Sequence, residues 1–149
     1  MIEQGTLTED VIAFFVSEGL EVGDNLAPAN GGWVKGQPNV NAFVPYVVVM
    51  TGDVRPKQGA AGCSYEEWDA FFSIRYFGGS REQLSKVTQT GRNLLAFKRW
   101  ITGVDDRFDV IQTHFVSLGA VTRVDTVDPP MWQVYDSIRF ELDRSRNQP

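Results

Sequence analysis

The chain of 149 residues is long enough for one domain with a sizeable core, and 42% hydrophobic and 22% charged residues are typical of a globular protein. Its net charge of −5 disfavours a reader of free duplex DNA, which usually presents a basic face. The only cysteine, Cys63, excludes an internal disulfide and a thiolate metal cluster. No apolar run reaches the roughly 20 residues that cross a bilayer, and the N-terminus is acidic, so we expect a soluble cytoplasmic protein without membrane contact.

The first predicted element is a helix over residues 7–18. Thr6 and Glu9 have capping-box spacing, and the apolar residues that follow recur at helical intervals. Gly19 is placed to end the helix in a left-handed conformation. Residues 20–43 are rich in Gly, Pro and Asn, which predicts a long irregular segment with a functional or partner-binding role.

Trp33 lies in that irregular segment, where it packs either into its own core or against a neighbouring molecule. The apolar run in residues 43–52 predicts a strand buried on both faces. A Gly-rich connection over 52–64 follows, too long for a tight hairpin, and it carries Arg55 and Lys57.

Residues 67–77 alternate between apolar and polar positions and predict a half-buried strand. Ser80 and Gln83 then form a second capping box, which opens a helix predicted over 81–99. Phe97 and Trp100 fall opposite the apolar stripe of this helix, and large aromatic side chains on a wet face require a covering partner or loop.

The last part of the chain predicts a loop over 101–114, a strand over 114–127 bent or broken at Gly119, and a final strand over 131–144. The predicted fold class is therefore α+β, a single domain over 1–149. Its mainly antiparallel sheet has about four strands, with two helices on one face, in the order α-β-β-α-β-β.

The two strands that contain Ser-Ile-Arg, at 73–75 and 137–139, place their isoleucines on one face and Ser and Arg on the other. Arg75 and Arg139 then share the less apolar face, where Asp69 and Glu141 are candidates to separate the like charges. This repetition indicates two half-buried strands of one sheet rather than a repeated functional motif.

Candidate catalytic groups are sparse. His114 follows Asp105, Asp106 and Asp109, but the spacing of a calcium loop is absent, and a solvated acidic turn is the simpler interpretation. The glycine pairs lack the spacing of a phosphate loop. We therefore expect no catalytic residues, no metal and no cofactor. As the alternative, the chain would be a small pocket enzyme or ligand-binding domain. Asp136, on the apolar face of the last strand, would then be a lone buried carboxylate with a raised pKa that serves as a general acid or base.

The order of elements resembles that of the tail terminator proteins of long-tailed bacteriophages. The resemblance rests on an alternating strand that leads directly into a helix, "DAFFSIRYFGGSREQLSKVTQTGRNLL", and on the terminal strand "WQVYDSIRFEL". The resemblance covers about residues 7–144. It implies a structural virion protein without enzymatic activity, assembled in the host cytoplasm and located at the head-proximal end of the tail. Such proteins form a hexameric ring that ends tube polymerisation and joins the head-tail connector, and DNA passes through the ring without sequence recognition.

Under this resemblance the expected partners are further copies of the chain, the tail tube protein and the connector protein. Residues 1–52 carry a charge balance of −5 and residues 81–100 one of +4, so oppositely charged faces could meet between subunits. The expected inter-subunit residues are Lys86, Arg92, Phe97 and Trp100. The expected contacts to the tube or connector are Arg55, Lys57 and Trp33.

Overall fold

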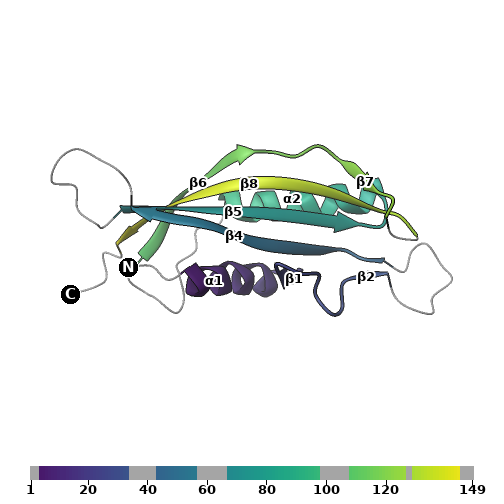
Figure 1. Ribbon diagram of the computed structural model, residues 1–149, viewed down its shortest axis with the longest axis horizontal. Helices are drawn as coiled ribbons and strands as arrows, with labels where there is room; N and C mark the ends of the chain where they lie inside the picture. Colours follow the sequence, from purple (N-terminus) through teal and green to yellow (C-terminus); the bar gives the residue numbers. More distant parts are fainter. Residues whose placement is uncertain (1–3, 34–42, 57–66, 98–107, 127–128, 145–149) are drawn as a thin grey trace.

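The computed structural model describes residues 4–33, 43–56, 67–97, 108–126 and 129–144 (Figure 1). In chain order its elements are α1 (Gln4–Ser17), β1 (Glu21–Asp24), β2 (Gly32–Trp33), β3 (Phe43–Val44), β4 (Tyr46–Pro56), β5 (Glu67–Gly78), α2 (Arg81–Phe97), β6 (Phe108–Ser117), β7 (Thr122–Val124) and β8 (Met131–Arg144).

Six strands form one mixed sheet in the order β1-β4-β5-β8-β6, with β7 also paired to β8, and β2 and β3 form a separate two-stranded sheet. β1 runs parallel to β4, while the other neighbours are antiparallel. The predicted fold class, with a mainly antiparallel sheet of about four strands, was therefore wrong. The missed strand β1, Glu-Val-Gly-Asp, has almost no strand signal of its own, because it depends on hydrogen bonds from the edge of β4.

The far edge of the sheet is one strand interrupted in the middle. β6 pairs with the second half of β8 as far as Ser117, opposite Ser137, and β7 resumes with Thr122 opposite Gln133. The predicted break at Gly119 is confirmed, because residues 118–121 leave the ladder between the two strands. β6 begins at Phe108, however, so the loop predicted over 101–114 was wrong in its second half.

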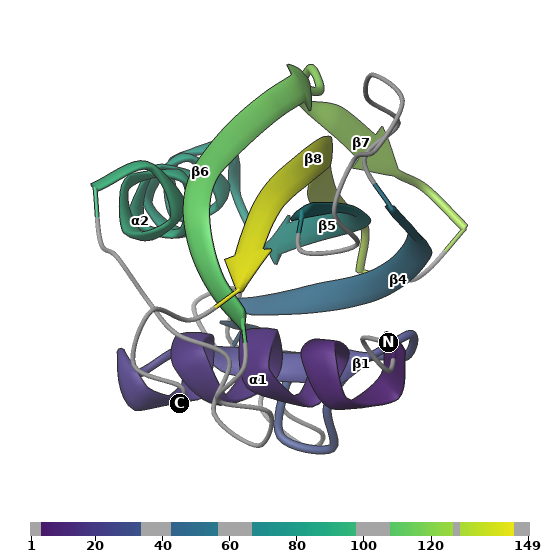
Figure 2. The same cartoon turned by 90° about the vertical axis from the view of Figure 1, so that its left-hand side faces the viewer.

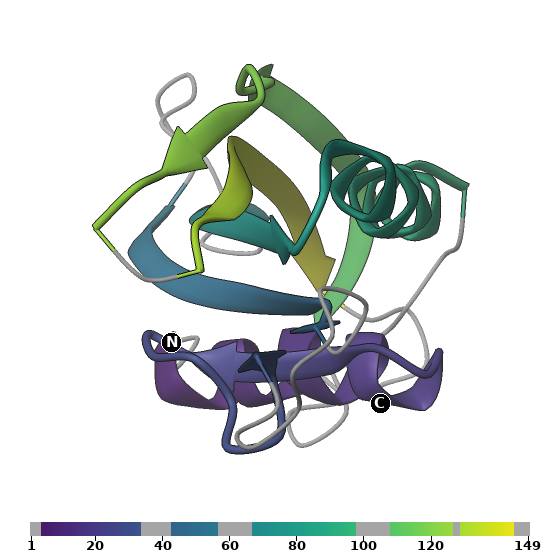
Figure 3. The ribbon, with the colours of Figure 1, turned by 90° about the vertical axis from the view of Figure 1, so that its right-hand side faces the viewer.

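The main core lies on one face of the sheet and receives side chains from both helices. Alternate residues of β5 are buried as predicted, and Ile74 and Tyr76 are fully inaccessible. Val11 and Phe15 of α1 join the same apolar cluster as Leu84 of α2. Figures 2 and 3, which look along the strands from opposite ends, show α1 lying under β4 at the level of β1, whereas α2 lies beside β5, β8 and β6.

Local capping signals set two helix ends. Gly19 has a φ of 87°, its amide donates to Val16, and the amide of Leu20 donates to Phe15, which is a Schellman ending of α1. The predicted α1 start was wrong, because the helix begins at Gln4 and Thr6 lies inside it.

The second capping box is confirmed in one of its two bonds at the start of α2. The amide of Gln83 donates to Ser80 Oγ at 3.2 Å, and Gln83 Oε1 accepts from the amide of Gly79 at 2.7 Å. The Ser80 hydroxyl thus caps the amide of Gln83 as predicted, whereas the Gln83 side chain bonds the amide of Gly79 instead of that of Ser80. α2 is described as far as Phe97, and the remainder of the predicted helix over 81–99 lies outside the described residues.

The opposite face of the sheet carries the two arginines of the Ser-Ile-Arg stretches. The two stretches run antiparallel with Ser73 opposite Ser137, so Arg75 and Arg139 lie on opposite sides of this serine pair along the sheet. Arg75 lies over the ring of Tyr135 at 5.0 Å, and Arg139 is opposite Phe71. Separation along the antiparallel register, rather than an interposed acid, is thus what keeps the like charges apart.

Candidate functional site

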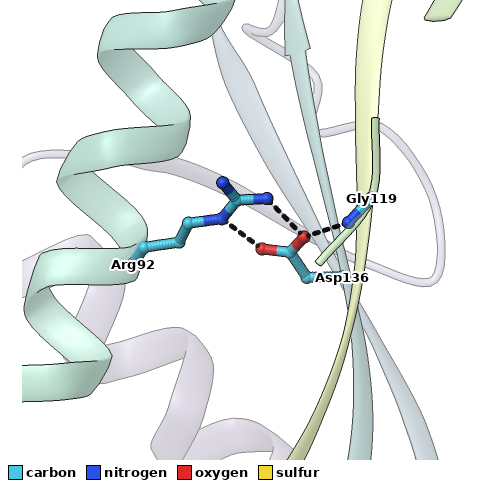
Figure 4. A network of polar contacts seen from close by, with 3 residues as sticks. All are labelled: Arg92, Gly119 and Asp136. Carbon is cyan, nitrogen blue, oxygen red and sulfur yellow. Dashed lines mark hydrogen bonds and ion pairs between the residues drawn. The ribbon is translucent and has the colours of Figure 1, made fainter. Parts of the chain in front are cut away.

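A polar contact around the fully buried Asp136 joins α2, β8 and the break between β6 and β7 (Figure 4). Asp136 Oδ2 accepts from Arg92 Nε at 2.8 Å, and Oδ1 accepts from Arg92 Nη2 at 2.7 Å. The amide of Gly119 donates to the same Oδ1 at 3.0 Å. A fully buried carboxylate is therefore held by a bidentate guanidinium and one backbone amide, the geometry in which such pairs are strongest.

Three local features build this contact. Asp136 belongs to the alternating positions of β8 that face the core, and Arg92 lies next to Gly91 at the side of the buried stripe of α2. Gly119 must be a glycine there, because a Cβ would come within 2.1 Å of the carbonyl oxygen of Tyr135. The break in the edge strand therefore frees one amide to reach Asp136, while the backbone passes directly over β8.

Burial and charge shift two pKa values around the contact. Hydrogen bonding to Asp136 raises the pKa of the Arg92 guanidinium, against the opposing effect of its burial. Burial, and then the negative charge of Asp136, raise the pKa of the Tyr76 phenol well above its ordinary value, although Arg92 opposes this. The Tyr76 hydroxyl is buried without a hydrogen-bond partner, and it stays protonated beside the ion pair.

A pocket of about 360 Å³ adjoins the ion pair, between α2, the strand break and β8. It is lined by Leu84, Ser85, Thr88, Gln89, Arg92, Asn93, Gly119, Val121 and Val134. Thr88 is only 5% exposed, and its hydroxyl has no hydrogen-bond partner. The pocket thus combines an aliphatic wall with several polar side chains, which is the usual make-up of a small-ligand site.

The structure changes the premise of the acid–base alternative. Asp136 is buried, as its position on the apolar face of the strand predicted, but it is not a lone carboxylate. Its charge is balanced by Arg92, and both of its oxygens already accept strong hydrogen bonds. The arrangement can fix the position of α2 against β8, and a pocket adjoins it.

Of the predicted tube or connector contacts, Arg55 and Trp33 lie in the described residues, in β4 and β2 respectively. Arg55, at the end of β4, pairs with Asp53 at 2.5 Å and lies over the ring of Phe71 at 5.7 Å. Trp33 packs edge-on against Phe43 at 5.1 Å, in a small cluster of its own chain, and its indole Nε1 is buried. Of the two packing alternatives for Trp33, the structure therefore supports its own core. Lys57 lies outside the described residues.

Of the predicted inter-subunit residues, Lys86 and Arg92 have different surroundings. Lys86 is exposed and lies 3.7 Å from Glu82 on the outer face of α2. Arg92 instead turns inward to Asp136, and only 29% of its side chain is exposed. Phe97 is the last residue of α2, and Trp100 lies outside the described residues.

The sequence did not predict three exposed aliphatic residues along the interrupted edge strand, Val116, Leu118 and Val121, which we call the edge patch. These side chains are 60%, 54% and 45% exposed, respectively. The only sequence signal is that "FVSLGAV" stays apolar through the strand break at Gly119, where a solvent-facing connection would normally turn polar.

Neither described helix combines the length and the apolar character that crossing a membrane requires. Within the described ranges, no group of three or more His, Cys, Asp or Glu side chains is arranged to hold a metal ion. His114 Nε2 lies 3.2 Å from Glu141, while Asp105 and Asp106, two of the acids considered with it, fall outside those ranges.

Comparison with known protein families and curated proteins found no match. No family model matches the chain, and no curated protein shows a significant match to it.

Proposed function

We propose that the chain is a structural subunit of a bacteriophage tail, which assembles into a hexameric ring at the head-proximal end of the tail tube. In this role it ends tube polymerisation and joins the tube to the head connector, with DNA passing through the ring. The proposal starts from the sequence resemblance of the strand that leads into α2 and of the last strand, and the edge patch is the structural observation that supports it most directly.

The two edges of the sheet differ in a way that suits a ring. β1 is a four-residue edge strand with Glu21 and Asp24 at its ends, and short, charged edges resist pairing with other chains. The opposite edge, β6 and β7, exposes the aliphatic side chains of the edge patch. A closed ring needs two different surfaces on each subunit, so an apolar edge that meets another surface of the next copy fits this requirement.

The energy available from the edge patch is substantial. About half of each of its three side chains is exposed. Full burial of such a side chain contributes about 1.5–3 kcal/mol, so burying the exposed half contributes about 1 kcal/mol for each residue. The predicted contact between the acidic N-terminal part of one subunit and the basic α2 of the next is a separate prediction. Lys86 is an exposed basic residue of α2 that such a contact would use.

The test is the mass of the purified protein by sedimentation velocity, together with negative-stain electron microscopy. We expect rings for the parent chain and monomers for the variant Val116→Lys/Leu118→Lys, with an unfolding transition retained in both. Leu26→Lys is the matched control, because Leu26 is 76% exposed and lies between β1 and β2, away from the edge patch.

A monomeric parent chain would refute the ring itself. Rings that persist in the doubly substituted variant would show that the subunits associate through another surface. Loss of rings in the Leu26→Lys control would mean that any added charge disrupts assembly, and the edge patch would lose its special role.

A further inference from the structure

Helix α1 is apolar on its outward side as well as on its core side. The sequence "VIAFFV" spans residues 11–16, and Val11 and Phe15 of this run are fully buried in the core. The outward side of the same run is aliphatic too, and we call it the helix patch: Ile12, which is half-buried, Ala13, which is exposed, and Val16, which is 53% exposed. A surface helix normally turns polar residues outward, and a helix that is apolar all round is normally buried. The helix patch therefore has the character of a surface that another molecule covers.

The helix patch and the edge patch lie on opposite sides of the molecule. β1, which packs beside α1, forms one edge of the sheet, and β6 with β7 forms the other. Figure 2 shows α1 at the bottom of the molecule and the end of β6 at the top, with β4, β5 and β8 between them. In a closed ring, each subunit presents one surface to the subunit before it and a different surface to the subunit after it. Two exposed apolar patches on opposite sides suit such a head-to-tail contact.

The charges around the two patches are opposite in sign. Residues 1–34 contain no Lys or Arg, and the exposed acids Glu9 and Glu18 stand on either side of the helix patch in the sequence. Residues 112–124, which contain the edge patch, include Arg123 and no acid, and α2 beside this edge carries three basic residues and one acid. Unlike charges favour contact between the helix patch and the edge patch, whereas two helix patches facing each other would bring like charges together.

We propose that the helix patch of one subunit covers the edge patch of the next subunit around the ring, so that Val16 packs among Val116, Leu118 and Val121. This inference rests on the proposed function, because it names the surface that the edge patch meets in the ring. The contact joins side chains of a helix to those of an edge strand, so it needs no pairing with the short, charged strand β1. Both "VIAFFV" and "FVSLGAV" then lose apolar surface to the contact, which gives a physical reason for their composition.

The experiment is chemical cross-linking of the full-length protein with a short bis-maleimide, read on a denaturing gel. Cys63, the only cysteine, is first replaced by alanine, and one cysteine is then placed in each patch as Val16→Cys and Leu118→Cys. Both positions are exposed, so these two substitutions leave the core unchanged. Leu26→Cys with Leu118→Cys is the matched control, because Leu26 is an exposed aliphatic residue outside both patches.

We expect the variant with both cysteines to give a ladder of covalent oligomers, because each subunit joins two neighbours through two different sites. Either cysteine alone should leave the chain monomeric on the gel, since the partner site then holds no thiol. The Leu26 control should give no ladder. Val16→Lys should weaken subunit association at least about tenfold in sedimentation velocity, because burial of the valine is lost and an ammonium group must be desolvated.

Dimers formed by Val16→Cys alone would overturn the proposal in favour of a two-fold contact between helix patches, and dimers formed by Leu118→Cys alone would indicate a two-fold contact between edge patches. A ladder of equal intensity in the Leu26 control would also contradict the proposal, because cross-linking would then not depend on the helix patch. Rings in electron micrographs without a ladder would overturn the contact between the two patches and leave the ring standing. A monomeric parent chain would refute the ring and this contact together.

Discussion

Replacing Arg92 by methionine tests the contact that joins α2 to β8 and the strand break. The substitution keeps most of the aliphatic stem and removes both hydrogen bonds, 2.7 and 2.8 Å long, from the buried Asp136 carboxylate. Only the 3.0 Å bond from the Gly119 amide would remain. Breaking a buried ion pair on one side costs about 3–5 kcal/mol, because the other charge stays buried without a partner.

The lower end of that range applies here, because 29% of the Arg92 side chain is exposed and water can approach from that side once the guanidinium is gone. We therefore expect Arg92→Met to lower the free energy of unfolding by about 3 kcal/mol. For a chain of this length the midpoint of thermal unfolding would fall by about 6–12 °C. Urea unfolding followed by circular dichroism, at one fixed protein concentration, measures both parent and variant.

Two further variants decide whether the reasoning holds. Adding Asp136→Asn to Arg92→Met removes the stranded charge and should recover about 2 kcal/mol of the loss, so the two substitutions are strongly coupled. Arg123→Met breaks the exposed pair with Asp125, 2.8 Å apart, and should cost less than about 1 kcal/mol. If Arg92→Met costs no more than the Arg123 control, or if Asp136→Asn adds a further loss, the buried charge is not what the guanidinium stabilises.

Two other predictions concern Tyr76. Gly91→Ala should destabilise the protein by about 1–3 kcal/mol in thermal unfolding, because the added Cβ would lie 2.3 Å from the Tyr76 ring. Helix propensity alone predicts an unchanged or higher unfolding midpoint, and that result would contradict the packing of Gly91 against Tyr76. The second prediction follows from the raised pKa of the buried Tyr76 phenol. The folded state then keeps the phenol proton that the unfolded chain releases near pH 10. The contribution of Tyr76 to the free energy of unfolding is therefore complete below about pH 10 and is lost as the pH rises further. Stability measured from pH 8 to pH 11 should fall less steeply in Tyr76→Phe than in the parent chain, and parallel profiles would refute the assignment.

Much of the local structure followed from the sequence, because its signals act over a few residues. Alternation in residues 67–77 identified which side chains of β5 enter the core. Ser80 and Gln83 marked the start of α2, and Gly19 and Gly119 marked the end of a helix and the break of a strand. Strand β1 gave no comparable signal, because hydrogen bonds to β4 make it a strand, and those depend on how α1 and the turn at Gly19 place it.

In the candidate site, too, some features follow from local sequence and others depend on contacts between distant residues. By itself the sequence determined that Asp136 would lie on the apolar face of the last strand, because strand alternation is local. Only the tertiary structure decided that Arg92, 44 residues away, balances its charge, and that Gly119 adds an amide. Pairing between distant residues depends on sheet order and on the side of β8 where α2 packs, and neither is encoded in any short segment. For this reason a lone carboxylate in the sequence became an ion pair in the fold, and Arg92, expected at the surface, became part of the interior contact.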